Sequence, residues 1–157
     1  MAIGELVYVL EGSGFTTVRD DVAGKEKSFE WNERALFHIP RHSTHQIGNA
    51  RGDKPARLLH YNYLPVAMSV VPDPDFFLNN DYRGSVEGEL ETLFSEAQEM
   101  RNDDSMNSIR VVWSGNFFPD MRVWDQLDQL ASRGAGGRAV MIDFPGSELT
   151  CHMSVIP

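Results

Sequence analysis

The sequence predicts an all-β domain, a sandwich or barrel of short strands, with one or two α-helices in a connecting segment. The first sixty or so residues hold a series of short apolar or alternating runs, each bounded by turn residues. The runs succeed one another too closely for a βαβ unit, which favours a sandwich or barrel. A composition of 41% hydrophobic and 24% charged residues is typical of a soluble globular protein.

The expected strands are ELVYVLEG (5–12), FTTVR (15–19), KSFEW (27–31), ALFHIP (35–40) and ARLLHYNYLP (56–65). The first is rich in apolar and β-branched residues and ends at a Gly-Ser-Gly turn. The second comes at hairpin distance, so these two strands are predicted to pair. The third alternates polar and apolar residues, as a half-buried strand does. The last two are each closed by a proline.

The composition changes after Pro65, and residues 67–138 are interpreted as a connecting segment. Residues 70–84 are rich in Pro, Asp and Asn and are expected to be irregular. An apolar stripe predicts a helix near 86–101, and a shorter helix is expected near 120–132. Residues 139–157 are again strand-like. They would either open a second barrel or close the first.

Charge and cysteine content restrict the possible partners. The net charge is -9, and the 14 Lys and Arg residues are scattered, so a nucleic-acid partner is not expected. No apolar run is long enough to cross a bilayer and no signal peptide is recognisable, so no membrane partner is expected either. The single cysteine, Cys151, fits a reducing cytoplasm, where we expect the protein to be located.

Two short patterns could carry chemistry. Glu5 is followed after six residues by Gly12, and "PRHSTHQIGN" places His45 and Asn49 after Pro40. Together they resemble the two motifs of the cupin superfamily. By this resemblance Glu5 and His45 correspond to metal ligands, and Gly12, Pro40 and Asn49 to structural positions of the motifs.

The resemblance implies a cupin jelly-roll barrel, similar to those of two-barrel (bicupin) proteins related to gentisate dioxygenase. It covers Glu5 to about Pro65 (residues 1–66 as a barrel domain) and, loosely, the last twenty-odd residues. The implied cofactor is a divalent metal ion, with Fe(II) first and Mn, Ni or Zn as alternatives. Imidazole and carboxylate ligands that leave coordination positions open suit dioxygen or substrate binding.

The sequence also departs from the cupin pattern. Arg34 and His42 stand where the second motif has glycines. The histidine pair of the first motif should lie just before Glu5, where only Met1 to Gly4 precede. We therefore interpret the chain as a fragment that lacks its first strands. The metal ion implied by the resemblance can be present or absent in such a fragment. Strands left unpaired in this way predict a homo-oligomer, for example a dimer.

The other histidines carry weaker signals. His42 could turn toward the same centre as His45, or simply face solvent. His38 could point into the barrel and line a pocket, or fill the core with its ring hydrogen-bonded. His60 and His152 have no motif spacing and are expected to be structural. Packing between the helices and the barrel is the simpler explanation for the aromatic residues of the middle segment, namely Trp113, Phe117, Phe118 and Trp124.

Two functions from different classes are compatible with these patterns. The first is a cupin-type protein derived from a metal-dependent oxygenase or related enzyme that acts on a small organic acid, for example an aromatic one, with its activity impaired in this chain. The second is a non-catalytic cupin that binds a small metabolite or serves as a structural module. A fold of this kind hosts many functions and does not choose between them.

Overall fold

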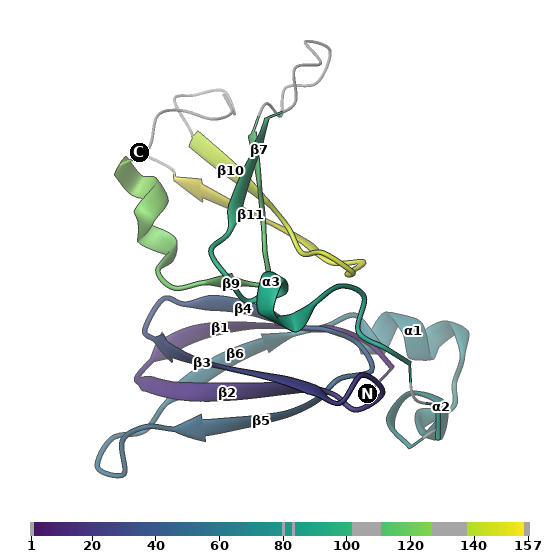
Figure 1. Cartoon of the computed structure of the whole chain (residues 1–157). Coiled ribbons are helices and arrows are strands. Elements are labelled where there is room, and N and C mark those ends of the chain that lie inside the picture. The colour runs from purple at the N-terminus through teal and green to yellow at the C-terminus, as the bar shows by residue number, and fades with distance from the viewer. Residues whose placement is uncertain (1, 80, 83, 102–110, 127–137, 156–157) are drawn as a thin grey trace.

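The part of the chain that the structure describes is mainly β with a few short helices, as the sequence predicts. The structure is a computed structural model of the whole chain and describes residues 2–79, 81–82, 84–101, 111–126 and 138–155 (Figure 1). Its strands form three sheets, and within the described ranges none of them closes into a barrel. No described helix is long and apolar enough to span a membrane.

All three sheets are open, and the third stands above the body formed by the first two, with its strands at a steep angle to theirs (Figure 1). The first has the order β6 (Arg57–Tyr61), β1 (Glu5–Glu11), β4 (Leu36–Ile39) and β9 (Phe117–Phe118). The second has the order β3 (Lys25–Asn32), β2 (Ser13–Asp20) and β5 (Thr44–Asn49). The third has the order β11 (Thr150–Val155), β10 (Arg138–Asp143), β8 (Val111–Ser114) and β7 (Gln98–Arg101). Strand neighbours are antiparallel, except that β8 and β10 run parallel.

The predicted hairpin between the first two strands is wrong. β1 pairs with β4 and β6, whereas β2 pairs with β3 and β5. Gly12 alone links β1 to β2, and its φ of +91° lets the chain cross from one sheet to the other within a single residue. The sequence indicates a chain turn at this Gly-rich segment. The turn carries the chain from the first sheet to the second, and it does not join two paired strands of one hairpin.

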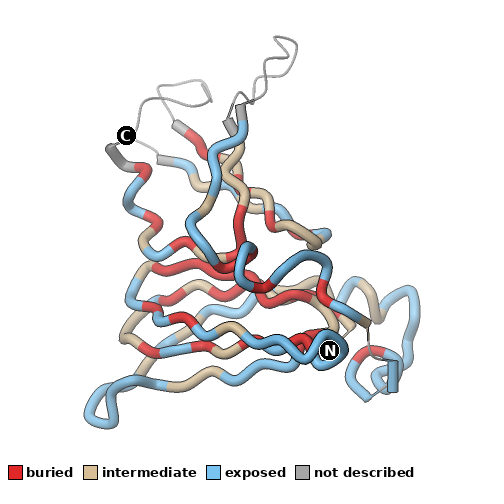
Figure 2. The backbone as a smooth tube through the Cα atoms, in the orientation of Figure 1, coloured by how far each residue is buried: buried red, intermediate tan, exposed pale blue. Residues whose placement is uncertain are grey.

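The first core lies between the first and second sheets. Inward side chains of β1 (Val7, Val9), β2 (Val18) and β3 (Phe29, Trp31) meet there, and all are at most 8% exposed. The indole N–H of Trp31 donates to Thr16 Oγ1 at 2.9 Å, so this buried polar pair is satisfied. The period of two along each strand accounts for the alternation of buried and exposed residues in Figure 2.

A second core lies on the opposite face of the first sheet. Leu6 of β1 and Leu36 of β4 pack there against Ile142 of β10 and against Phe144. The first sheet is therefore covered on both faces, which explains why β4 is buried along its whole length. The strands β10 and β11 belong to the third sheet. They pair with β8 and with each other, and not with any described strand of residues 1–66.

The helices are shorter than the sequence indicates. The helix expected near 86–101 is only one turn, α3 (Leu90–Leu93), and β7 occupies the end of that range. Val86, Leu90, Leu93 and Phe94 are buried together in the first core, as the stripe requires, whereas Met100 is 45% exposed. Pairing with β8 holds the end of this segment extended.

Other helical segments differ from expectation as well. α1 (Leu64–Val70) and α2 (Pro74–Leu78) lie in a stretch interpreted as a strand end and an irregular connection. Asp73 caps α2 by accepting a hydrogen bond from the Asp75 N–H, and an Asp directly before a Pro is a local sign of a helix start. The expected helix near 120–132 begins as a 3₁₀ helix, η1 (Met121–Gln126), and its second half lies outside the described residues.

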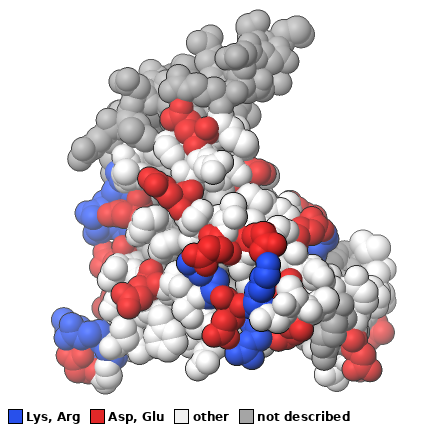
Figure 3. Space-filling model, viewed as in Figure 1, with Lys and Arg blue, Asp and Glu red and all other residues white. Residues whose placement is uncertain are grey.

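Surface charges are mixed. On the face drawn in Figure 3, basic and acidic side chains lie next to one another without a basic patch. Lys25 and Lys27 of β3 pair with Glu89 and Glu91 at 2.5 Å each, which links the second sheet to the segment that contains α3. Both glutamates are largely exposed, so each pair contributes little stability.

Candidate functional site

Glu5 and His45 reach the same interior space from different sheets. Glu5 stands opposite Ile39 in the β1–β4 ladder, and Ile39 belongs to the first core. His45 stands opposite Val18 in the β2–β5 ladder, and Val18 belongs to the same core. Directly paired residues project to the same face of a sheet, so both side chains face the space between the first two sheets.

His60 joins Glu5 at this place. His60 lies on β6 opposite Val7, which is also a residue of the first core. Its Nδ1 is 3.3 Å from Glu5 Oε2, and Asn62 Nδ2 donates to Glu5 Oε1 at 3.4 Å. The Glu5 side chain is only 14% exposed, against 40% for His60. We call Glu5, His45, His60 and Asn62 the inter-sheet cluster.

Electrostatics links His45 to the other members of the cluster. Although His45 is exposed as a residue, desolvation by the surrounding protein lowers the pKa of its imidazole. The Glu5 carboxylate raises the pKa of His45 and His60 lowers it, and the net effect leaves this pKa below its usual value. His45 is therefore neutral at pH 7 and can accept or donate a hydrogen bond without carrying charge.

His38 lies on the other face of the first sheet, away from the cluster. It stands opposite Leu6, and its ring stacks on Phe144 with 5.4 Å between ring centroids. Asn116 Nδ2 lies 3.2 Å from His38 Nδ1, while His38 Nε2 is buried without a partner among the described residues. Burial lowers the pKa of His38 to about 4. Of the two alternatives for His38, the structure shows the core position.

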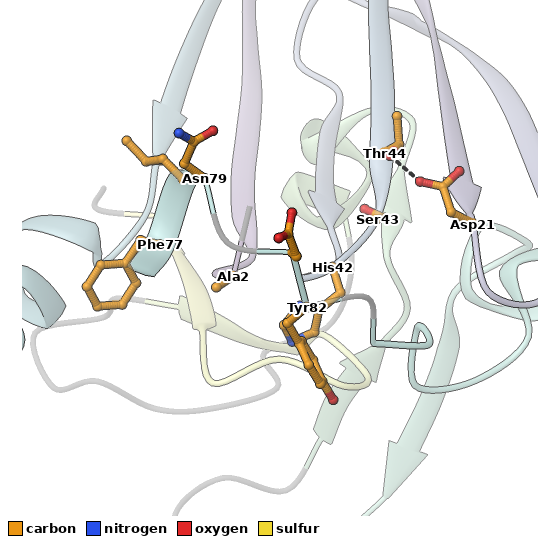
Figure 4. Close-up of a pocket in the computed structure, with 10 residues that line it drawn as sticks. Ala2, Asp21, His42, Ser43, Thr44, Phe77, Asn79 and Tyr82 are labelled. Atoms are coloured by element: carbon orange, nitrogen blue, oxygen red, sulfur yellow. Dashed lines mark hydrogen bonds between the residues drawn. The ribbon is translucent and has the colours of Figure 1, made fainter. Parts of the chain in front are cut away.

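His42 is also separate from the cluster. Its ring lies edge-on to Tyr82 with 5.0 Å between ring centroids. Together with Asp21, Thr44 and Asn79 it lines a polar cavity of about 320 Å³ (Figure 4). Thr44 Oγ1 donates to Asp21 Oδ2 in the wall of this cavity at 2.5 Å. His42 and His45, three residues apart in the sequence, therefore lie at different places.

The motif positions Gly12, Pro40 and Asn49 all lie at strand ends. Gly12 has a positive φ, and Asn49 Nδ2 donates to the Lys54 carbonyl at 2.8 Å while its Oδ1 accepts from the Arg51 N–H at 2.9 Å. Asn49 thus closes the turn between β5 and β6. The buried Pro40 ends β4, and its carbonyl accepts from the Ser43 hydroxyl at 2.6 Å.

The two departures from the cupin pattern also have a conformational signature. Among the described non-glycine residues, Arg34 and His42 have positive φ values, of 73° and 62°. Glycine adopts this left-handed region at no steric cost, whereas other residues are strained there. Both positions are those at which the cupin motif has glycine.

Two cluster residues, His60 and Asn62, were missed by sequence analysis. Neither has motif spacing, and the run ARLLHYNYLP does not indicate which strand lies beside it. The signal that could have found them is the pairing of β6 with β1, because that register places His60 beside the residues just after Glu5. Such a pairing joins residues more than fifty positions apart and leaves no local pattern.

The cluster does not form a metal centre as its side chains lie. Two imidazoles and one carboxylate are suitable donors for a divalent ion. However, no group of three or more His, Cys, Asp or Glu side chains in the described part of the chain is arranged to hold one. The Glu5 carboxylate is already engaged by His60 and Asn62. The donor set therefore does not fit a preformed metal site.

Comparisons of the chain with protein-family models, with curated proteins and with solved structures gave no match.

Proposed function

We propose that this chain is a cupin-type protein, an open jelly-roll fold of metal-dependent oxygenase descent, that binds a small organic molecule without catalysing the oxygenase reaction. The inter-sheet cluster is the proposed binding site. The single observation that carries this proposal is the convergence of Glu5 and His45, from two different sheets, on one interior space. The left-handed φ values of Arg34 and His42, at glycine positions of the cupin motif, support the same ancestry.

The cluster's charge favours some ligands over others. Glu5 is an acid, the His45 imidazole is neutral at pH 7, and Asn62 offers an uncharged amide. Within the described residues, the polar side chains that contact Glu5 are His60 and Asn62, and neither is a Lys or Arg. An organic acid would meet the Glu5 carboxylate and would need a bridging cation. A ligand with hydroxyl or amino groups suits these residues better.

The donor types support a second candidate, a metal-dependent oxygenase acting on a small organic acid. Two histidines and one glutamate are the donor types of many non-haem iron oxygenases. Since these side chains are not arranged around an ion, this candidate requires them to rearrange on metal binding. We expect divalent metal binding weaker than micromolar and no dioxygen uptake.

Calorimetric titration separates the two candidates. Mn(II) and, under anaerobic conditions, Fe(II) are titrated into the wild-type chain, Glu5→Gln and Glu11→Gln. Glu11 is the matched control, because it lies on the same strand but pairs with Arg57 at the opposite end. Weak binding that is lost in Glu5→Gln and kept in Glu11→Gln is expected. Tight one-to-one binding with dioxygen uptake would establish the oxygenase instead.

Ligand binding is tested directly with 2-aminoethanol, which carries a hydroxyl and an amino group, and with acetate as its anionic counterpart. We expect 2-aminoethanol, without metal, to shift the imidazole NMR signals of His45 and His60 saturably, and acetate to leave them unchanged. Glu5→Gln should abolish the shifts. Shifts that persist in Glu5→Gln, or that acetate produces equally, would refute the proposed site.

A further inference from the structure

The outer edge of β6 (Arg57–Tyr61) is an open strand edge at the side of the first sheet. Among the described strands β6 pairs with β1 alone, and it runs toward α1 (Figure 1). A ladder with one neighbour engages the backbone N–H and C=O groups of alternate residues, so the other groups of an edge strand point away from its sheet. No further backbone hydrogen bond between described residues involves residues 57–61. This edge therefore presents a row of donors and acceptors with which another strand can pair.

Two large apolar side chains are exposed on the same strand. Leu59 stands opposite Tyr8 and Tyr61 stands opposite Leu6 in the β1–β6 ladder. Leu6 and Tyr8 pack in the second core, so Leu59 and Tyr61 lie on that face of the first sheet. The third sheet leaves both of them largely uncovered, with exposed fractions of 54% and 60%. The edge of β6 thus combines unpaired backbone groups with uncovered apolar side chains.

The other edge strands of the three sheets differ from β6 in this respect. β3, β5, β9 and β11 expose no large apolar side chain among those described, and β7 exposes only Met100. β3 also carries two lysines and two glutamates, and such charges oppose pairing with another chain. β6 has no Pro, Lys, Asp or Glu, and Arg57 at its start already pairs with Glu11. Of the described edges, β6 is therefore the least protected against a further strand.

The sequence of β6, RLLHY, is complementary to itself in an antiparallel pair. One register alone pairs all five residues of two copies, and it places Leu59 opposite Leu59 on a twofold axis. Arg57 then lies opposite Tyr61, which pairs a guanidinium with an aromatic ring, and no two like charges face each other. Leu58 lies opposite His60 on the other face of the sheet. The two copies thereby extend one sheet, with their exposed leucine and tyrosine side chains side by side on the same face.

We propose that the chain forms a weak homodimer by antiparallel pairing of β6 with β6 of a second copy. A different partner would have to supply a complementary strand, whereas a second copy brings one with it. Five residues from each copy, with their neighbouring side chains, bury on the order of 1,000 Å², the size of weak and transient complexes. We therefore expect a dissociation constant of roughly 10–100 µM.

This interface does not rest on the proposed ligand site. It uses the edge of β6 and the face that carries Leu59 and Tyr61. The Glu5 and His60 side chains face the space between the first two sheets instead. The dimer and the ligand site can therefore fail or succeed separately.

Disulfide trapping tests the register. Leu59→Cys, Tyr61→Cys and Val22→Cys are each made in a Cys151→Ser background, which removes the natural thiol. Position 59 lies on the twofold axis, where the two Cα atoms are about 5 Å apart, within the reach of a disulfide. The two copies of position 61 are about 14 Å apart in the same register, which is too far. Val22, in the turn between β2 and β3, is 54% exposed like Leu59 and controls for random collisions.

Under mild oxidation with glutathione, Leu59→Cys should form covalent dimers at least about tenfold faster than either control variant. Hydrogen exchange of the unmodified chain supplies a second measurement that needs no substitution. Raising the chain from about 10 µM to about 1 mM should slow exchange of the outward amides of β6 at least about threefold and leave those of β3 unchanged. Cross-linking of Leu59→Cys no faster than that of Tyr61→Cys, or β6 exchange that does not depend on concentration, would overturn the proposal.

Discussion

Replacing Gly12 by alanine tests the geometry that carries the chain from the first sheet to the second. Gly12 has φ +91°, and a Cβ there would lie 2.9 Å from the Ala56 Cα and 2.9 Å from the Pro55 carbonyl oxygen. Both neighbours are backbone atoms, so neither can rotate away. The Ala56 Cβ at 3.2 Å adds to the crowding.

The magnitude is the sum of three contributions. Holding alanine at such a φ costs about 1–3 kcal/mol. Overlap with immobile backbone adds roughly 1–3 kcal/mol. The reduced entropy of the unfolded chain returns about 0.4–1 kcal/mol. We therefore expect Gly12→Ala to lower the free energy of unfolding by about 1–6 kcal/mol, with a central value of about 3 kcal/mol, a large fraction of the stability of a typical domain.

Two other glycines supply matched controls. Gly24 has φ +66° but open space around it, so Gly24→Ala should cost only the conformational strain, about 1 kcal/mol net. Gly52 has open space and no positive φ, so Gly52→Ala should stabilise the chain by about 0.4–1 kcal/mol. Urea unfolding of the three variants gives these differences. The reasoning is refuted if Gly12→Ala is no less stable than Gly24→Ala.

Three further predictions concern strain, pH and association. Arg34→Gly should raise the free energy of unfolding by about 0.5–1 kcal/mol, because it relieves the strain of the left-handed φ. His42→Gly should be close to neutral, because the same relief is offset by loss of the ring contact with Tyr82. A destabilised Arg34→Gly in thermal unfolding would contradict this. The pKa of folded His38, about 4, lies below its usual 6.5, so the folded state binds fewer protons, and stability present above pH 6.5 is lost as the pH falls toward 4. By about pH 4.5 this loss is roughly 2–3 kcal/mol. Urea unfolding of His38→Leu should show a correspondingly shallower pH dependence, and an identical pH dependence would count against a buried neutral His38. The outer edge of β6 has no strand partner in the described sheets, and it exposes Leu59 and Tyr61. Sedimentation velocity should therefore detect concentration-dependent self-association, which Leu59→Lys should weaken. A strictly monomeric wild-type chain would contradict this prediction.

The strands could be predicted from the sequence because their signals are local. Alternation in KSFEW and the apolar run after Glu5 each define a strand within a few residues, and β3 and β1 are found there. The inward orientation of Glu5 and His45 agrees with the motif resemblance. It depends on the ladders with Ile39 and Val18, which the structure supplies.

The pairing of strands and the length of the middle helix could not be predicted in the same way. Gly12 bends the chain into a second sheet, and a Gly-rich turn does not distinguish this from a hairpin. The apolar stripe from Val86 to Phe94 packs on the first core, but the pairing of β7 with β8 makes the end of that range a strand. His60 was missed for the same reason, because only the β1–β6 ladder brings it to Glu5.

The closeness of Glu5 to His45 is tested most directly by titrating the His45 imidazole by NMR in the wild-type chain, in Glu5→Gln and in Glu26→Gln. Glu26 is a control carboxylate on β3 that pairs with Arg19. Because the Glu5 carboxylate raises the pKa of His45, Glu5→Gln should lower this pKa further, and Glu26→Gln should not change it. A His45 pKa that is the same in all three proteins would contradict the shared interior site.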